Sequence, residues 1–416
     1  MICTLGKTPL IALAVTASRP VLPPGFTLLQ IVPDLETGGA EQSTLDVSRA
    51  VVQAGGRSLV ASRGGRMVKR LEQDGGEWIS ASVHSKNPLT ILANARRLAA
   101  LAKREGVSVL HVRSRAPAFS TMIAARLSGR PWLATYHGAY PAKSALKRWY
   151  NSVMTRGELV IANSDFTARH LLANHPVDRD KVVIIPRGAD FARFDPEAIE
   201  PERIAKLQSA WGVDPAESRL KVLLAGRFTR LKGQLVLVQA AARLRAAGRD
   251  DLLLILVGDD QGRNEYRAEV VDAVLRAGLQ ECVRIAGHCS DMPAAYAAAD
   301  LVAVPSTVPE TFGRTAVEAQ AMRRPVIASA LGGLTETVVD GETGWLAPAG
   351  DPEAWAQALA RAVDAGPRRR AEIGATGRER ALRLYAVEKM TDATLGAYLR
   401  ILKARALPAK VGPVWR

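Results

Sequence analysis

From Phe26 onward, short apolar runs alternate with longer stretches in which apolar residues recur every three or four positions. The short runs predict buried strands, and the period of about 3.6 residues predicts helices packed against them. This alternation is typical of a parallel sheet covered by helices on both faces. In the first half we predict strands at 27–32, 58–61, 107–112, 132–136, 159–162 and 182–185, and helices at 41–53, 88–104 and 164–174.

The pattern stops between Pro186 and Arg219, where four prolines and dense charge interrupt it. It restarts at Lys221 and repeats the same scheme. In this half we predict strands at 221–225, 252–257, 282–286, 301–304, 325–328 and 344–347, and helices at 234–247, 266–276, 315–322 and 387–406.

Two similar halves suit the length, because 416 residues exceed what one hydrophobic core usually supports. We therefore expect an α/β protein with two doubly wound, Rossmann-like domains facing across a cleft at the carboxyl ends of both sheets. The expected parts are an N-terminal extension over 1–25, a first domain over 26–186, a linker over 187–220, a second domain over 221–386, and a helix over 387–416 that could cross back to the first domain.

Composition fits a globular chain, since 48% of the residues are apolar and 5% are aromatic. The cysteines at 3, 282 and 289 form no C-x-x-C pair, which favours a reducing compartment, and their spacing around His288 matches no zinc pattern. The apolar run 10–17 resembles a short signal peptide with a thin basic segment, and we expect an extension or a misplaced start instead. The expected location is cytoplasmic, with peripheral attachment to the inner face of the plasma membrane.

The formal net charge of +15 is concentrated in the first half. Nucleic acid, anionic lipid and phosphorylated substrates would all suit such a balance. The sequence contains no recognised nucleic-acid-binding motif, so we expect no nucleic acid partner.

Two strand-to-helix turns have the composition of anion-binding sites. Gly38 and Gly39 precede the helix predicted at 41–53, and adjacent glycines let a backbone approach an anion at a helix N-terminus, although a plain tight turn is an equal alternative. Arg227 and Lys232 follow the strand predicted at 221–225 and flank the next helix start. Two cations at a strand's carboxyl edge suit a diphosphate, and a solvated basic turn is the alternative.

The segment 305–318, PSTVPETFGRTAVE, carries the strongest signal. Glu310 lies in a loop after a predicted strand, Gly313 permits a tight approach, and Glu318 lies inside the next helix. Two carboxylates at these places can hold hydroxyls on two parts of one ligand. A capping acid and a surface glutamate are the alternative.

These residues together resemble the signature of glycosyltransferase family 4: Gly38-Gly39, Arg227, Lys232 and the E-x7-E pair. Residues 184–190 resemble the family's pre-linker motif, with Arg187 where Asn is usual, and residues 330–345 resemble its closing Gly-rich segment. The resemblance implies the GT-B fold, a nucleotide-sugar donor as substrate, retention of anomeric configuration, and neither metal nor cofactor.

The resemblance also implies individual roles. Arg227 and Lys232 would neutralise the donor diphosphate, assisted by Gly38 and Gly39. Glu310 would hold sugar hydroxyls as the leaving phosphate departs, and no protein nucleophile is assigned. The remaining donor-binding positions would be Glu318 at the ribose, Thr311, Phe312 and Gly313 through their backbone, and His137 at the donor sugar, for which an ordinary strand-end histidine is the alternative.

Basic residues of the first half suggest an acceptor or membrane surface. Lys143, Lys147 and Arg148 recur at helical spacing within 142–156, whose apolar residues Leu146, Trp149, Tyr150 and Val153 resemble an interfacial anchor on anionic lipid. An ordinary helix of the domain that buries the same apolar residues is an equally favoured alternative. Arg113 and Arg115 end a predicted strand and could hold an acidic acceptor.

The D-x-D at Asp178 and Asp180 precedes a predicted strand, so we expect a turn there and no metal. The expected function is a metal-independent hexosyltransferase acting on a glycan or glycolipid acceptor of the cell envelope, such as lipopolysaccharide core. Two alternatives are a nucleotide-sugar epimerase of the same fold, for which no acid–base constellation is evident, and a non-catalytic nucleotide-binding protein associated with a membrane.

Overall fold

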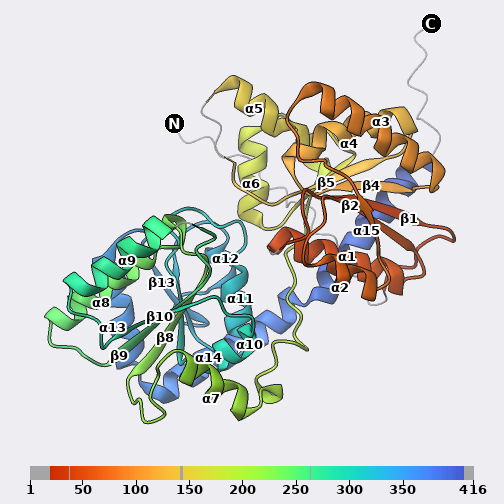
Figure 1. Cartoon of the computed structure of the whole chain (residues 1–416). Coiled ribbons are helices and arrows are strands. Elements are labelled where there is room, and N and C mark those ends of the chain that lie inside the picture. The colour runs from red at the N-terminus through yellow and green to blue at the C-terminus, as the bar shows by residue number, and fades with distance from the viewer. Residues whose placement is uncertain (1–18, 37, 141–143, 263, 407–416) are drawn as a thin grey trace, which may run out of the picture. The chain divides into compact units, whose positions relative to one another are not determined.

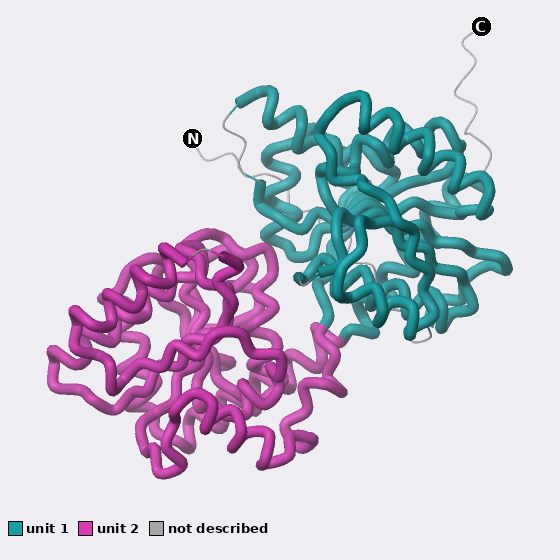
Figure 2. Tube along the Cα trace, viewed as in Figure 1, with its two compact units in different colours: residues 1–188, 387–416 teal, residues 189–386 magenta. Residues whose placement is uncertain are grey.

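A computed structural model describes residues 19–36, 38–140, 144–262 and 264–406. The chain divides into two compact units, coloured separately in Figure 2. Unit 1 comprises the chain up to Gly188 together with the segment from Val387 onward, and unit 2 runs from Ala189 to Ala386.

Unit 1 contains a seven-stranded sheet in the order β3-β2-β1-β4-β5-β6-β7, and all its neighbouring strands are parallel (Figure 1). The direction of winding reverses between β1 and β4, which is the topological switch point of a doubly wound fold. The strands are β1 (Thr27–Ile31), β2 (Arg57–Ser62), β3 (Glu77–Ser80), β4 (Val109–Val112), β5 (Trp132–Tyr136), β6 (Leu159–Ala162) and β7 (Val182–Ile184).

Helices cover both faces of this sheet, which explains why its central strands are buried throughout. Helix α15 (Val387–Ala406) packs with α1 (Gly39–Gln53) against one face, where Phe26 and Tyr398 stack. The helices are α1 (Gly39–Gln53), α2 (Val68–Gln73), α3 (Pro88–Arg104), α4 (Arg115–Ser128), α5 (Ala145–Asn151), α6 (Asp165–Asn174) and α15 (Val387–Ala406), with 3₁₀ turns η1 (Ser152–Thr155) and η2 (Arg179–Lys181).

Unit 2 repeats the design with a six-stranded parallel sheet in the order β10-β9-β8-β11-β12-β13. Its switch point lies between β8 and β11, so the carboxyl ends of these two strands are the expected ligand edge. The strands are β8 (Leu220–Ala225), β9 (Leu252–Val257), β10 (Val283–Gly287), β11 (Leu301–Val304), β12 (Val326–Ser329) and β13 (Gly344–Ala347).

The helices of unit 2 form two hydrophobic layers, one on each face of the sheet. Trp355 on α13 is fully buried in one layer, and Tyr296 on α10 is buried in the other. The helices are α7 (Pro201–Ala210), α8 (Gln234–Ala246), α9 (Asn264–Arg276), α10 (Met292–Ala297), α11 (Arg314–Ala321), α12 (Leu334–Thr337), α13 (Pro352–Asp364) and α14 (Gly366–Tyr385), with 3₁₀ turns η3 (Pro196–Ala198) and η4 (Arg230–Lys232).

The predicted fold class is confirmed, because both units are Rossmann-like α/β layers. The sequence assigns residues 187–220 to a linker, but the part from 189 onward belongs to unit 2, includes η3 and α7, and buries Trp211 and Val213 in the core. The expected extension over 1–25 lies largely outside the described residues. Within the described ranges, no helix is long and apolar enough to cross a membrane.

Candidate functional site

The ligand edge of unit 2 begins with the turn between β8 and α8. Gly233 has a φ of +74°, and a Cβ added there would lie 1.9 Å from the carbonyl oxygen of Pro305, directly after β11. A residue with a side chain would therefore push the two backbones apart. This close approach places Lys232, the preceding residue, beside the loop that carries Glu310.

Lys232 and Glu310 form an ion pair, with 2.6 Å between Nζ and Oε1. The Ser306 hydroxyl also donates to Oε1 of Glu310. The backbone of Glu310 is held from the other side, because Gly333 N–H donates to its carbonyl oxygen at 2.7 Å and Gly332 pairs with it in an isolated bridge. A carboxylate and an ammonium are thus fixed together at the carboxyl end of β11.

Glu318 lies on α11, whose N-terminus begins after Gly313 in the left-handed region at φ +89°. Its carboxylate is buried and accepts from Arg314 Nε at 2.6 Å and from the Tyr296 hydroxyl at 3.0 Å. Burial and the adjacent Glu318 raise the pKa of Tyr296 well above 10, so this hydroxyl stays a donor. Phe312 is buried and packs edge-on against Tyr385. Two hydrogen-bond donors, Arg314 and Tyr296, therefore orient the carboxylate of Glu318.

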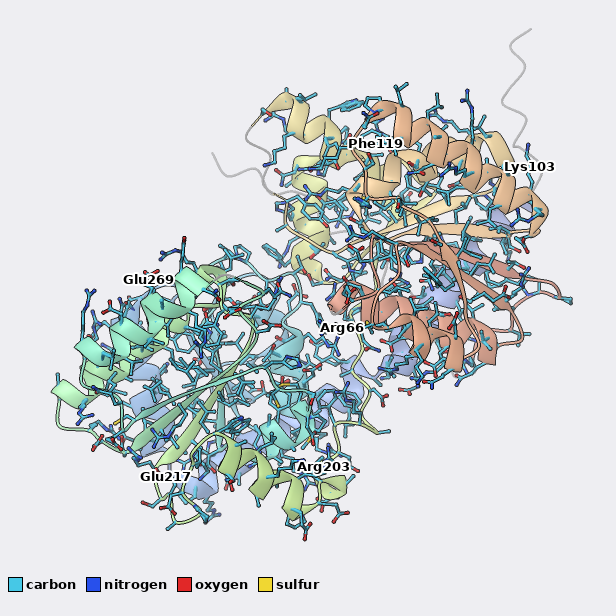
Figure 3. The ribbon with its side chains drawn as sticks, in the orientation of Figure 1. Arg66, Lys103, Phe119, Arg203, Glu217 and Glu269 are labelled. Atoms are coloured by element: carbon cyan, nitrogen blue, oxygen red, sulfur yellow. The ribbon has the colours of Figure 1, made fainter. Side chains whose placement is uncertain are left out.

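Arg227 leaves the end of β8 and is exposed, with Nη1 3.3 Å from Oε1 of Gln261. Together with Arg230 it lines a cavity of about 810 Å³ beside the first turn of α9. Arg230 is paired with Glu269, which is labelled on α9 in Figure 3. Arg227 and Lys232 therefore lie on one connection, and Lys232 forms the ion pair with Glu310.

In unit 1, α1 begins at Gly39, next to the guanidinium of Arg187. A Cβ at Gly39 would lie 2.1 Å from Arg187 Nη1, and Nη2 of Arg187 lies 2.8 Å from Nδ1 of His137. Gly38 is extended, and a Cβ there would meet the carboxylate of Glu41. Gly39, Arg187 and His137 therefore converge at the carboxyl edge of the sheet in unit 1.

His137 is neutral in this environment. Burial lowers the pKa of His137 well below 6.5, and the nearby cations Arg187 and Arg113, with His111, lower it further. Because Arg187 donates to Nδ1, the hydrogen-bond network assigns the imidazole proton to Nε2. Arg187, which the sequence marked only as a departure from the family motif, thus sets the tautomer of a predicted site residue.

The two predicted acceptor arginines differ in their surroundings. Arg113 is buried, its Nε and Nη2 donate to Oε1 of Gln30 at 2.9 and 2.7 Å, and burial lowers its pKa to about 10. Arg115 donates to Asn151 at 2.7 Å and lies over the ring of Tyr140. Each is held within unit 1 by these contacts, and an acceptor role for either stays a prediction.

The predicted anchor helix is divided in the structure. Helix α5 gives way to η1 at Ser152, and the expected apolar residues separate, with Leu146 and Trp149 74% and 53% exposed and Val153 fully buried. Trp149 contacts Phe119 of α4, which is labelled in Figure 3. Exposed Lys147 and Arg148 lie on α5 as predicted, whereas Lys143 lies outside the described residues.

The D-x-D acids form the expected turn. Asp178 precedes η2 and its exposed carboxylate lies 3.6 Å from Lys181. Across the described parts of the chain, no group of three or more His, Cys, Asp or Glu residues could hold a metal ion. Cys282 and Cys289 are free cysteines that flank β10.

Two family models match the chain, "Glycosyltransferase Family 4" over residues 37–193 and "Glycosyl transferases group 1" over residues 219–365. Two relatives named D-inositol 3-phosphate glycosyltransferase are each 35% identical. The relative from Salinispora tropica matches over 59% of this chain and 52% of its own length, and the one from Kineococcus radiotolerans over 63% and 61%. The match thus spans between half and two thirds of these relatives.

Solved structures agree with this similarity. A glycosyltransferase from Rickettsia africae ESF-5 is 34% identical, with a TM-score of 0.84 over 92% of this chain and 100% of that chain. Anabaena Alr3699/HepE in complex with UDP-glucose is 25% identical, with a TM-score of 0.78 over 90% and 99% of the two chains. On these matches across both units, the chain belongs to the glycosyltransferases, with a family 4 domain in its first half and a group 1 domain in its second.

Proposed function

We propose that the protein transfers a hexose or a related sugar from a nucleotide-sugar donor, with retention of anomeric configuration. The observation that carries this proposal is the Lys232–Glu310 pair at the carboxyl ends of β8 and β11, with Arg227 on the same connection. The similar Anabaena structures contain UDP-glucose or UDP and glucose, which supports a sugar nucleotide as the ligand of this edge.

The proposed chemistry follows from where charge develops. Breaking the bond between the anomeric carbon and the phosphate oxygen leaves negative charge on the diphosphate and positive character on the sugar. Lys232 and Arg227 stabilise the diphosphate, and the carboxylate of Glu310 holds sugar hydroxyls. Because Glu310 and the Gly233 turn already position Lys232, little reorganisation is needed when the donor binds. The reaction requires no metal or cofactor in this proposal.

For the acceptor we propose a cell-envelope glycan or glycolipid, such as lipopolysaccharide core. Exposed Leu146 and Trp149 beside Lys147 and Arg148 on α5 support contact with an anionic membrane, which would place the enzyme peripherally on the inner face of the plasma membrane. The names of the curated relatives supply a second candidate, an inositol phosphate. The basic excess of the chain suits either acceptor.

The test of this function is sugar transfer by two variants, Lys232→Ala and Glu310→Ala. Each should lower turnover by at least about a hundredfold while the protein stays folded, since each removes transition-state stabilisation. The matched control is Lys221→Ala, because Lys221 forms a comparable pair with Asp300 at 3.1 Å at the amino end of β8. We expect the control to stay within about threefold of wild type.

Labelled-sugar transfer would be measured with UDP-, GDP- and ADP-sugars on lipopolysaccharide core, lipid-linked saccharide and inositol 3-phosphate. The anomeric proton coupling of the product in NMR reports retention. Normal turnover in either site variant would contradict the assignment. Conversion of the sugar nucleotide without transfer would instead support an epimerase, and donor binding without any reaction would support a non-catalytic binding protein.

A further inference from the structure

A second basic cavity lies in unit 1, at the opposite edge of the sheet from His137. Its volume is about 570 Å³, and it lies where β5, β6 and β7 begin. Because these strands are parallel, their amino ends are remote from the carboxyl edge that carries the candidate site. Its charged lining residues are Arg126, Arg130, Arg156, Glu158, Lys181 and Arg405.

The charge balance of this cavity is strongly positive. Glu158, the single acid of the lining, accepts from Arg405 at 2.6 Å and from the backbone N–H of Trp132 at 2.9 Å. Lys181 has an exposed partner, Asp178, at 3.6 Å. The one lining carboxylate is therefore already neutralised, and it cannot also balance the remaining arginines.

Arg126 and Arg130 carry positive charge that no acid of the cavity balances. Their side chains make no hydrogen bond or ion pair with any residue that the structure describes, and Nε of Arg130 is buried without a hydrogen-bond partner there. A buried N–H without an acceptor is costly, and clustered cations repel one another. A phosphate meets both needs, since its oxygens accept from several guanidinium groups.

Exposed apolar side chains adjoin the cavity. Arg156 lines it, and its guanidinium carbon lies 5.5 Å from the centroid of the Trp149 ring. Trp149 is 53% exposed and Leu146, on the same helix, is 74% exposed. A tryptophan beside phosphate-binding cations suits the interface between water and lipid, where its ring enters the apolar layer.

We propose that this cavity binds the phosphate of an anionic phospholipid headgroup while Trp149 and Leu146 enter the membrane interface. Arg126 and Arg130 would hold the phosphate. This proposal specifies the site of the membrane contact proposed above, and it does not depend on whether the chain transfers a sugar. It would fix which face of unit 1 meets the bilayer.

The main experiment compares two double variants of the full chain. The cavity variant is Arg126→Gln with Arg130→Gln, and the control is Arg63→Gln with Arg66→Gln, two exposed arginines after β2 at the other edge of the sheet. Both remove two positive charges. On vesicles of phosphatidylglycerol and phosphatidylcholine, the cavity variant should bind about thirtyfold more weakly than wild type, and the control less than about threefold. Vesicles of phosphatidylcholine alone should bind neither.

Equal losses in both double variants would indicate diffuse charge attraction and would overturn the proposal, as would unchanged binding of the cavity variant. Glycerol 3-phosphate should compete with the vesicles for wild type, and Trp149→Ala should weaken vesicle binding while leaving this soluble probe bound. If the probe binds the cavity but vesicle binding does not depend on Arg126 and Arg130, the cavity serves a free phosphate compound and the lipid proposal fails.

Arg130→Gln alone provides a milder variant if the double variant does not fold. Transfer to a soluble acceptor, measured in parallel, reports separately on the proposed activity.

Discussion

Replacing Gly233 by Ala should damage the candidate site without touching any of its charged groups. The new Cβ would lie 1.9 Å from Pro305 O, whereas real contacts of this kind are not found below 3.0 Å, so the turn and the β11 loop must separate by at least 1.1 Å. Lys232 precedes this glycine and would move with it, away from Glu310. A displacement of about 1 Å in a catalytic group can lower a rate about a hundredfold.

The same change should also lower stability by two separable amounts. A residue with a side chain in the left-handed region, at φ +74°, costs about 1 kcal/mol, and the steric overlap adds about 2 kcal/mol. Gly248→Ala is the matched control. Gly233 precedes α8 and Gly248 follows the same helix, also in the left-handed region at φ +79°, but nothing lies within 4 Å of a Cβ added at Gly248. The control should lose about 1 kcal/mol and retain its turnover.

The assay measures sugar transfer and urea unfolding for both variants beside wild type. We expect Gly233→Ala to lose about a hundredfold in turnover and about 3 kcal/mol in the free energy of unfolding. If Gly233→Ala behaves like Gly248→Ala in both measurements, the close approach of Gly233 to Pro305 does not position Lys232.

Two further predictions concern metal and pH. Turnover should survive excess EDTA, because Arg227 and Lys232 meet the phosphate charge; complete loss restored by manganese or magnesium would bring Asp178 and Asp180 back as ligands. Thermal stability should fall as the pH drops below about 6.5, because burial, with nearby cations, holds the pKa of His111 and of His137 well below that value in the folded state. Each histidine changes the free energy of unfolding by at most about 1.4 kcal/mol per pH unit. His111→Gln should therefore flatten the profile of melting temperature between pH 7 and 5, whereas His84→Asn, at an exposed position, should not. Equal slopes in wild type and both variants would count against this cause.

Some elements were predicted to the residue. The bounds of β9 and α3 agree with the sequence analysis, because β9 is buried throughout and α3 starts at an Asn87 cap followed by Pro88. The edge strand β3 was missed, since it is only partly buried and its four residues show no continuous apolar run. The twenty-residue α14 was missed because basic and polar residues dominate it and few of its positions face the core.

The candidate site was predictable as separate motifs but not as contacts. Lys232 and Glu310 were each identified from their own turn, yet the pair depends on a backbone approach between Gly233 and Pro305, which lie 72 positions apart and which no local pattern encodes. The contact between Arg187 and His137 was missed for the same reason. For α5, the helical spacing was visible, but which apolar residues face the core depends on the neighbouring α4.

Binding of a sugar nucleotide to the full chain is the most direct test that Lys232 and Glu310 form a donor site. Thermal unfolding would be followed with UDP-, GDP- and ADP-sugars for wild type, the double variant Lys232→Ala with Glu310→Ala, and the Lys221→Ala control. At a hundred times its dissociation constant, a bound sugar nucleotide stabilises the wild type by about 2.7 kcal/mol, which raises the unfolding temperature by roughly 5–10 °C for a domain of this size. We expect such a shift with one of these donors in wild type and control, and little or none in the double variant. An equal shift in all three proteins, or no shift with any donor, would contradict it.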